Sequence, residues 1–249
     1  MAGLRMAAAQ SASIALDIEV NVALHLDFIA AAAGTGAELL VFPELSLCGY
    51  ELDRMAQCAV LADDARLAPL RERAMEHRMA IVVGAPVAPT APGGLPAIGA
   101  ITFHADGRRS VYRKHFLHSG EELHASAGSA LTQIIDVRAT PVALAICADT
   151  GNQQHPHAAA VAGARVYAAG MLISTGGYEA DSTMLAAYAK LFGMRVLMAN
   201  HATDSGGYAT AGRSAIWAAD GKLIVAAPGP GTLLVVADDD VSEVLSVSH

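Results

Sequence analysis

Apolar and polar positions in the first third of the chain predict an alternation of strands and helices. Residues 5–10, 38–42 and 80–87 are short apolar runs without helical periodicity, which is typical of buried strands. Residues 18–34 and 65–78 repeat apolar positions every three or four residues, as amphipathic helices do. The pattern therefore predicts helices that pack on a β-sheet.

Two β-hairpins interrupt this alternation. Residues 100–116 and 214–227 each place an Asp-Gly pair between β-rich arms. Asp-Gly in that setting is one of the strongest short hairpin signals. Between the hairpins we expect strands at residues 134–137, 141–147, 166–174 and 195–200. We expect helices at residues 154–164 and 181–194.

The hairpins decide the fold class. A purely parallel wound sheet would not use two of them, whereas mixed sheets do. Residues 80–87 and 141–147 are apolar on both faces, which is expected of strands that lie between another sheet and a helix layer. We predict an α/β fold, a four-layer α-β-β-α sandwich with two mixed β-sheets between outer helices. No internal repeat or long linker appears, so residues 1–249 should form a single domain.

Composition excludes several classes of protein. Hydrophobic residues make up 53% of the chain and charged residues 16%, which is globular and not disordered. The net charge of −8 argues against a nucleic-acid partner, which requires a basic face. The acidic segment 237–244 is expected to be a solvated end.

Three cysteines without regular spacing do not suggest a disulfide framework, so a reducing compartment is expected. The N-terminal stretch has no signal-peptide pattern, and the apolar stretches are interrupted well before about 18 residues, too soon for a membrane span. We therefore expect a cytoplasmic protein with no membrane partner.

Cys147 ends a core strand, and it is the candidate nucleophile. Taken alone it fits a buried core cysteine better, since free cysteine is among the most buried residue types. A reactive thiol needs a nearby base or cation. Glu44 follows a buried strand directly after Pro43, and Lys114 ends a hairpin arm. Each also has a plain structural interpretation. Glu44 could be an acidic residue in the first turn of a helix, and Lys114 could be one of several basic residues on a solvated hairpin arm.

Together these segments resemble a known family. "LLVFPELSLCGY", "VYRKHFL" and "LAICAD" resemble the three signature blocks of the nitrilase, or carbon–nitrogen hydrolase, superfamily, in which a Glu, a Lys and a Cys occur in this order. The resemblance extends over about residues 4–236. It includes "GEELHASAG", where the family has a second glutamate; the spacing to Gly128 favours Glu121 and leaves Glu122 as the alternative.

The resemblance implies an amide hydrolase that needs no cofactor and no metal. Glu44 would be the general base and Cys147 the nucleophile that forms a thioester. Lys114 and the backbone N–H of Ala148 would stabilise the oxyanion, and Glu121 would orient Lys114 or the substrate. Relatives often have an aromatic residue where this chain has Ala148, so the pocket is expected to be more open.

Two further residues are expected to bind substrate, Tyr50 in "CGY" and Thr175 in "STGGY". Tyr50 could equally be a packing residue. By the resemblance, "STGGY" lies where the family lines its acyl pocket, and an ordinary Gly-Gly turn is the alternative. The "HPH" segment with His155 and His157 invites a zinc interpretation, but no third ligand follows at a telling spacing.

The function predicted is cysteine-dependent hydrolysis of a small non-peptide C–N bond, either amide or N-carbamoyl, with release of ammonia or amine. The short C-terminal tail favours an amidase over a nitrile hydrolase. An isochorismatase-like cysteine hydrolase and a non-catalytic binding protein on the nitrilase fold are the alternatives. Linear amides, N-carbamoyl amines and ω-amide acids all remain open as substrates. The resemblance also implies a homodimer or higher homo-oligomer, which light scattering can test.

Overall fold

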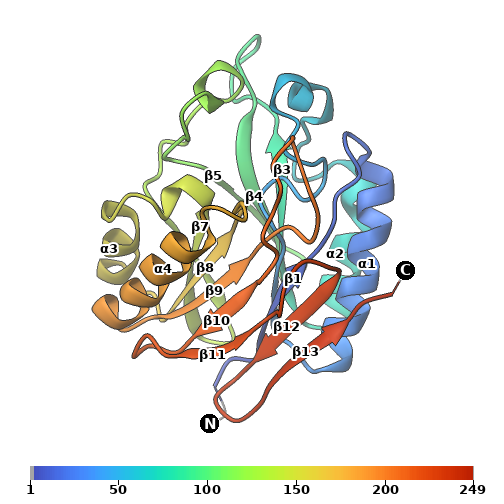
Figure 1. The fold of residues 1–249 in the computed structure, drawn as a ribbon. Coiled ribbons are helices and arrows are strands. Elements are labelled where there is room, and N and C mark those ends of the chain that lie inside the picture. Colours follow the sequence, from blue (N-terminus) through green and yellow to red (C-terminus); the bar gives the residue numbers. More distant parts are fainter. Residues whose placement is uncertain (1–2, 249) are drawn as a thin grey trace.

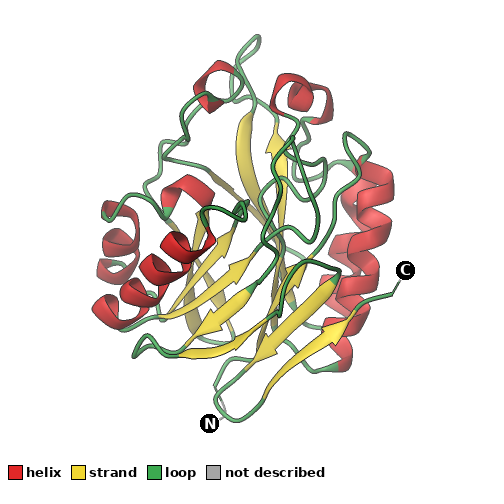
Figure 2. Cartoon of the chain, viewed as in Figure 1, coloured by secondary structure: helices red, strands yellow, loops and turns green. Residues whose placement is uncertain are grey.

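Two β-sheets lie face to face between outer helices in the computed structural model, which describes residues 3–248 (Figure 1). Strand β1 contacts β9 across the interface between the sheets, and β2 contacts β8. Figure 2 shows the strands at the centre and the helices on the two outer sides. The predicted four-layer α/β sandwich is confirmed.

The first sheet has seven strands in the order β13-β12-β1-β2-β3-β4-β5. It is mixed, because β1, β2 and β3 run parallel to one another while the remaining neighbours pair antiparallel. Its strands are β1 Met6–Gln10, β2 Leu39–Val41, β3 Ala80–Val87, β4 Ala97–Phe103, β5 Arg109–Arg113, β12 Leu233–Ala237 and β13 Ser242–Ser246. The predicted hairpin with Asp106-Gly107 at its tip is β4–β5.

The second sheet has six strands in the order β11-β10-β9-β8-β7-β6. Strands β7, β8 and β9 are parallel, and the flanking pairs are antiparallel. Its strands are β6 Gln133–Val137, β7 Thr140–Ile146, β8 Val166–Gly170, β9 Arg195–Ala199, β10 Ala215–Trp217 and β11 Leu223–Ala226. The hairpin predicted around Asp220-Gly221 is β10–β11.

Each sheet has its own pair of α-helices. Helices α1 (Ile18–Gly34) and α2 (Ala68–Glu76) cover the seven-stranded sheet, and α3 (Gln154–Val161) and α4 (Tyr178–Phe192) cover the six-stranded one (Figure 1). Short 3₁₀ helices span Leu52–Cys58, Ala65–Leu67, Glu121–Leu123 and Cys147–Asp149. No helix among residues 3–248 is both long and apolar enough to cross a membrane.

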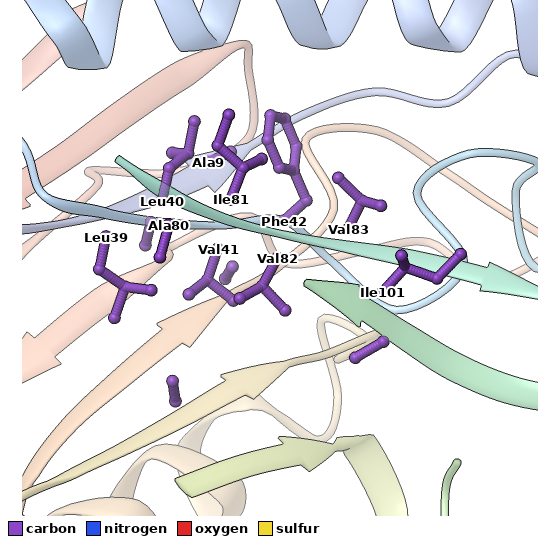
Figure 3. Close-up of a cluster of buried hydrophobic side chains, with 14 of the residues drawn as sticks. Ala9, Leu39, Leu40, Val41, Phe42, Ala80, Ile81, Val82, Val83 and Ile101 are labelled. Atoms are coloured by element: carbon purple, nitrogen blue, oxygen red, sulfur yellow. The ribbon is translucent and has the colours of Figure 1, made fainter. Parts of the chain in front are cut away.

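The main hydrophobic core fills the space between the sheets and under α1. Strands β2 and β3 are buried along their whole length, as expected of strands covered on both faces. Figure 3 shows how their side chains alternate, so that neighbouring residues point toward the helix layer and toward the other sheet. A second cluster lies between the six-stranded sheet and α3 and α4.

The C-terminal segment differs from expectation. Residues 237–244 were expected to be a solvated end, but the chain turns back and adds β13 as an edge strand beside β12. Asp238 organises this turn, because its Oδ1 accepts the backbone N–H groups of Asp240 at 2.8 Å and Val241 at 2.7 Å. The run of aspartates therefore forms the turn of a β-hairpin, which the pattern of charges alone did not indicate.

Two glycines let both sheets approach the turn that follows β2. A Cβ at Gly84 would lie 2.2 Å from the Pro43 carbonyl oxygen and 2.4 Å from the Leu45 backbone nitrogen. A Cβ at Gly170 would lie 2.7 Å from the Phe42 carbonyl oxygen. Since these are backbone atoms, the turn has no room to shift, and Glu44 is held between the sheets.

We predict that Gly84→Ala destabilises the protein by about 3 kcal/mol, the upper part of the range for overpacking, since its Cβ meets backbone. Urea unfolding followed by circular dichroism measures the change. The matched control is Gly34→Ala at the end of α1, where a Cβ would meet nothing within 4 Å. Equal stability of the two variants would contradict the close approach.

Candidate active site

Glu44 lies in the turn after β2 and is fully buried, with 1% of its surface exposed. Pro43 ends the strand, and the Nε2–H of His201 donates to the Glu44 carbonyl oxygen at 2.7 Å. Burial lowers the pKa of His201 to about 4, so it makes this contact as a neutral ring. The backbone of the candidate base is therefore fixed from several sides.

Lys114 follows β5 and has no exposed surface. Its Nζ lies 2.6 Å from Glu44 Oε1 and 2.7 Å from Glu121 Oε1, so two carboxylates share one ammonium. The backbone N–H of Lys114 donates to Ile98 and its carbonyl accepts from Gly128. Both ion pairs are completely buried. Burying the ammonium or a carboxylate without a partner of opposite charge would cost several kcal/mol, and the pairing offsets that cost.

Glu121, and not Glu122, is the second glutamate of the cluster. The Tyr50 hydroxyl donates to Glu121 Oε1 at 2.5 Å, and the His118 N–H donates to Oε2 at 2.7 Å. Glu122 is exposed and accepts from the Gly120 N–H. Of the two glutamates that spacing left open, Glu121 is therefore the one that lies beside Lys114.

Cys147 is the first residue after β7 and begins a short 3₁₀ helix. Its φ is 40°, a left-handed conformation that is uncommon outside glycine and often marks functional sites. The residue is partly exposed, whereas Cys48 and Cys58 are buried. Its Sγ lies 3.6 Å from the Leu172 carbonyl oxygen.

The charges of the cluster favour a neutral thiol beside a base. Burial raises the pKa of Glu44 from 4.5 to about 7; Lys114 opposes the rise and Glu121 adds to it. Burial and the Glu44 carboxylate also raise the pKa of the Cys147 thiol. Burial by itself would lower the pKa of Lys114, but the acidic groups around it outweigh that effect and keep it an ammonium.

One oxygen of Glu44 remains available for proton transfer. Oε1 pairs with Lys114, while Oε2 is buried and has no hydrogen-bond partner within residues 3–248. The Cys147 thiol interacts with this carboxylate closely enough to lower its pKa. The arrangement can therefore pass the thiol proton to Glu44 and leave a thiolate next to a fixed cation.

These groups lie at a cavity of about 560 Å³. That volume falls within the usual range for small-molecule sites. Ala148 and Tyr50 line the cavity, as predicted for substrate-binding residues. The lining residues are Glu44, Tyr50, Phe116, Leu117, His118, Ser119, Cys147, Ala148, Thr150, Gly151, Asn152, Met171, Leu172, Ile173, Ser174, Asp181 and Tyr208.

Thr175 is a correction to the predicted site. It is exposed and is not part of the cavity lining; its neighbour Ser174 is. Ser174 pairs with Thr210 in an isolated β-bridge, and the chain turns at Thr175, whose N–H donates to the Ala209 carbonyl oxygen. Residues 175–177 form a turn, which was the alternative interpretation of this segment, and Thr175 lies at its exposed start.

Asp149 connects the two segments that carry Lys114 and Cys147, and the sequence alone indicated no role for it. Its buried carboxylate accepts the N–H groups of His115 and Phe116 at Oδ1 and the N–H of Ile146 at Oδ2. It thereby joins the segment after Lys114 to the strand end that carries Cys147. A sequence signal existed, since this acid lies two residues after the candidate nucleophile, but its partners are distant along the chain.

His155 of the "HPH" segment supports this link. Tyr112 donates to Asp149 Oδ2 at 2.9 Å and lies 2.9 Å from His155 Nε2, and Tyr167 lies 2.8 Å from His155 Nδ1. Both ring nitrogens of the buried His155 are thus occupied by tyrosine hydroxyls. Burial lowers its pKa to about 4, so the ring is neutral.

Comparison with known proteins agrees with this geometry. The family model for carbon-nitrogen hydrolases matches residues 5–247. The chain belongs to the carbon–nitrogen hydrolase family. This result confirms the resemblance seen in the three short sequence blocks.

Solved structures of an amidase of the nitrilase superfamily are similar to this hydrolase. The NitN amidase from Nesterenkonia sp. AN1 is 27% identical, with 94% of this chain and 92% of that chain covered and a TM-score of 0.85. A cysteine-to-alanine variant of this amidase in complex with butyramide is 26% identical, covers 95% of this chain and 91% of that one, and has a TM-score of 0.86.

A third structure is of a glutamate-to-glutamine variant of the same Nesterenkonia amidase. It shows the Michael addition of acrylamide at the active-site cysteine. It is 26% identical, covers 94% of this chain and 92% of that chain, and has a TM-score of 0.85. The family and these neighbours support cysteine-dependent hydrolysis of a C–N bond.

We predict that kcat/KM rises with pH through a midpoint near 7, because Glu44 must be ionised to accept the thiol proton and its pKa is raised to about 7. Initial rates of ammonia release between pH 5 and 9, with a check that the protein stays folded, measure the profile. A midpoint near 4.5, the ordinary value for glutamate, would contradict the assignment of Glu44 as a buried base.

We predict that Asp149→Asn lowers the free energy of unfolding by about 3 kcal/mol, since an amide cannot accept at both positions and leaves buried donors unsatisfied. It should also lower kcat/KM by disturbing the link between Lys114 and Cys147. Asp220→Asn on the exposed β10–β11 turn is the matched control and should change neither quantity. Unchanged urea unfolding in Asp149→Asn would refute the link.

Proposed function

We propose that this carbon–nitrogen hydrolase cleaves the C–N bond of a small non-peptide amide through a thioester on Cys147. The observation that carries the proposal is the buried Glu44–Lys114–Glu121 cluster beside a partly exposed cysteine in one cavity. A base, a fixed cation and a nucleophile are the groups that acyl transfer requires.

In the first half of the reaction, the Cys147 sulfur forms a bond to the carbonyl carbon while its proton moves to Glu44. The negative charge that develops on oxygen faces Lys114 and the backbone N–H of Ala148. Each such donor typically contributes about 3–4 kcal/mol to the lowering of the barrier. The C–N bond then breaks, and Glu44 gives its proton to the departing ammonia.

In the second half, water attacks the thioester and loses a proton to Glu44. The C–S bond breaks, the carboxylic acid leaves, and the proton returns to the sulfur. Glu121 takes no part in bond making; with Tyr50 and the His118 N–H around it, it holds the Lys114 ammonium in place. No step requires an external cofactor.

Three considerations rank the alternatives. The two-sheet sandwich disfavours an isochorismatase-like hydrolase, which would have a single wound sheet. A binding protein that no longer catalyses would have no need of a buried base aligned with a thiol. Butyramide and acrylamide, bound in structures of the similar Nesterenkonia amidase, support linear aliphatic amides ahead of N-carbamoyl amines and ω-amide acids.

We predict that Cys147→Ala lowers ammonia release from butyramide by a factor on the order of 10⁴ or more, as loss of a nucleophile does in other hydrolases, while the protein stays folded. Cys58→Ala is the matched control and should retain activity, since Cys58 lies outside the cavity. Iodoacetamide should label Cys147 before Cys48 and Cys58. Full activity in Cys147→Ala would disprove the proposal.

A further inference from the structure

Asp181 is an acidic residue of the cavity that the mechanism above does not use. It lies in the first turn of α4 and lines the same cavity as Cys147. Its side chain is partly buried, and burial raises the pKa of its carboxyl group. A carboxylate in this position loses part of its hydration. No hydrogen bond or ion pair to its oxygens within the described residues replaces the lost water contacts.

The Asp181 carboxylate has neither an ion pair nor a side-chain hydrogen bond within the described part of the chain. The other acid of this helix turn, Glu179, behaves differently: it is exposed and pairs with Arg213 at 3.3 Å. An acid that served only to stabilise the helix N-terminus could point to solvent as Glu179 does. Asp181 instead faces the cavity.

Gly177 has no side chain between Asp181 and Ser174, two residues that line the cavity. A Cβ at Gly177 would lie 3.5 Å from both Asp181 Oδ2 and Ser174 Oγ, so two oxygen acceptors flank this position. A group with several N–H donors could bind both. An ammonium or guanidinium is such a group.

The charges around the cavity also favour a cation. The described residues that line it include no lysine and no arginine, while Glu44 and Asp181 are both acidic. The nearby Lys114 is already paired with two carboxylates. His118 is the one basic side chain among the lining residues, and its Nδ1 lies 3.1 Å from the Ser119 carbonyl oxygen.

We propose that the enzyme acts on amides that carry a protonated amine remote from the scissile bond, and that Asp181 selects them. The inference rests on the proposed function for the position of the amide at Cys147. The cavity volume of about 560 Å³ leaves room for a chain that reaches beyond the reacting group. Asp181 is thus a specificity-determining residue that binds the far end of the substrate.

The test compares 6-aminohexanamide with heptanamide, which has a methyl group in place of the ammonium. In the wild type, kcat/KM should be higher for 6-aminohexanamide by about tenfold, the lower end of what a hydrogen bond to a charged group contributes. Asp181→Asn should remove this preference. Adipamic acid, with a carboxylate at the same end, should be a poor substrate of the wild type and a better one of Asp181→Asn.

Glu179→Gln is the matched control, because it removes the same charge from the same helix turn outside the cavity. It should leave the ratio of the two kcat/KM values unchanged. If Glu179→Gln reduces the ratio as much as Asp181→Asn does, the preference comes from the overall negative field of the protein and the inference is wrong. A ratio near one in the wild type would overturn it too.

Binding separates this inference from the proposed function. Calorimetry with the Cys147→Ala variant measures the Kd of 6-aminohexanamide and heptanamide without turnover. A preference for the amine that is lost in Cys147→Ala/Asp181→Asn supports the role of Asp181 even if no amide is hydrolysed. Hydrolysis of both amides at equal rates, with equal Kd values, would refute that role and leave the amidase proposal standing.

Discussion

The ammonium of Lys114 lies where water cannot reach it, and it can stay charged there only because Glu44 and Glu121 lie within 2.7 Å. A buried charge without partners would be neutralised or would destabilise the fold by several kcal/mol. The three side chains come from the turn after β2, the end of β5 and a 3₁₀ helix. The ion pairs therefore join segments that follow two non-adjacent strands of the seven-stranded sheet.

This electrostatic arrangement couples stability to activity. The pKa of Glu44 is about 7 in the folded protein and about 4.5 for an ordinary glutamate. Between these values the folded state binds more protons than the unfolded state, so this group's contribution to stability falls as pH rises. Over the same interval the ionised base becomes more abundant. Under the proposed mechanism, activity is therefore highest in the pH range where Glu44 contributes least to the stability of the fold.

Local patterns were enough to predict most of the fold and the main catalytic candidates. The Asp-Gly hairpins, the doubly apolar strands and the three sequence blocks each depend on residues close together in sequence. Asp149 and Asp181 could not be assigned in this way, because the fold brings them to groups far away along the chain: the His115 N–H for Asp149, and the cavity that Cys147 lines for Asp181. Thr175 shows that side-chain direction in an irregular segment depends on a pairing that no local pattern records.

The first strand of the chain pairs with one of the last. β1 lies between β2 and β12, so one of its edges is completed only by residues 233–237, which β13 then covers. During synthesis on a ribosome, the apolar segment Met6–Gln10 emerges long before β12 and keeps an open edge until Leu233–Ala237 has been made. Such an edge can pair with other chains. Until the β12–β13 hairpin has been made, the nascent chain therefore presents an edge that is prone to aggregation.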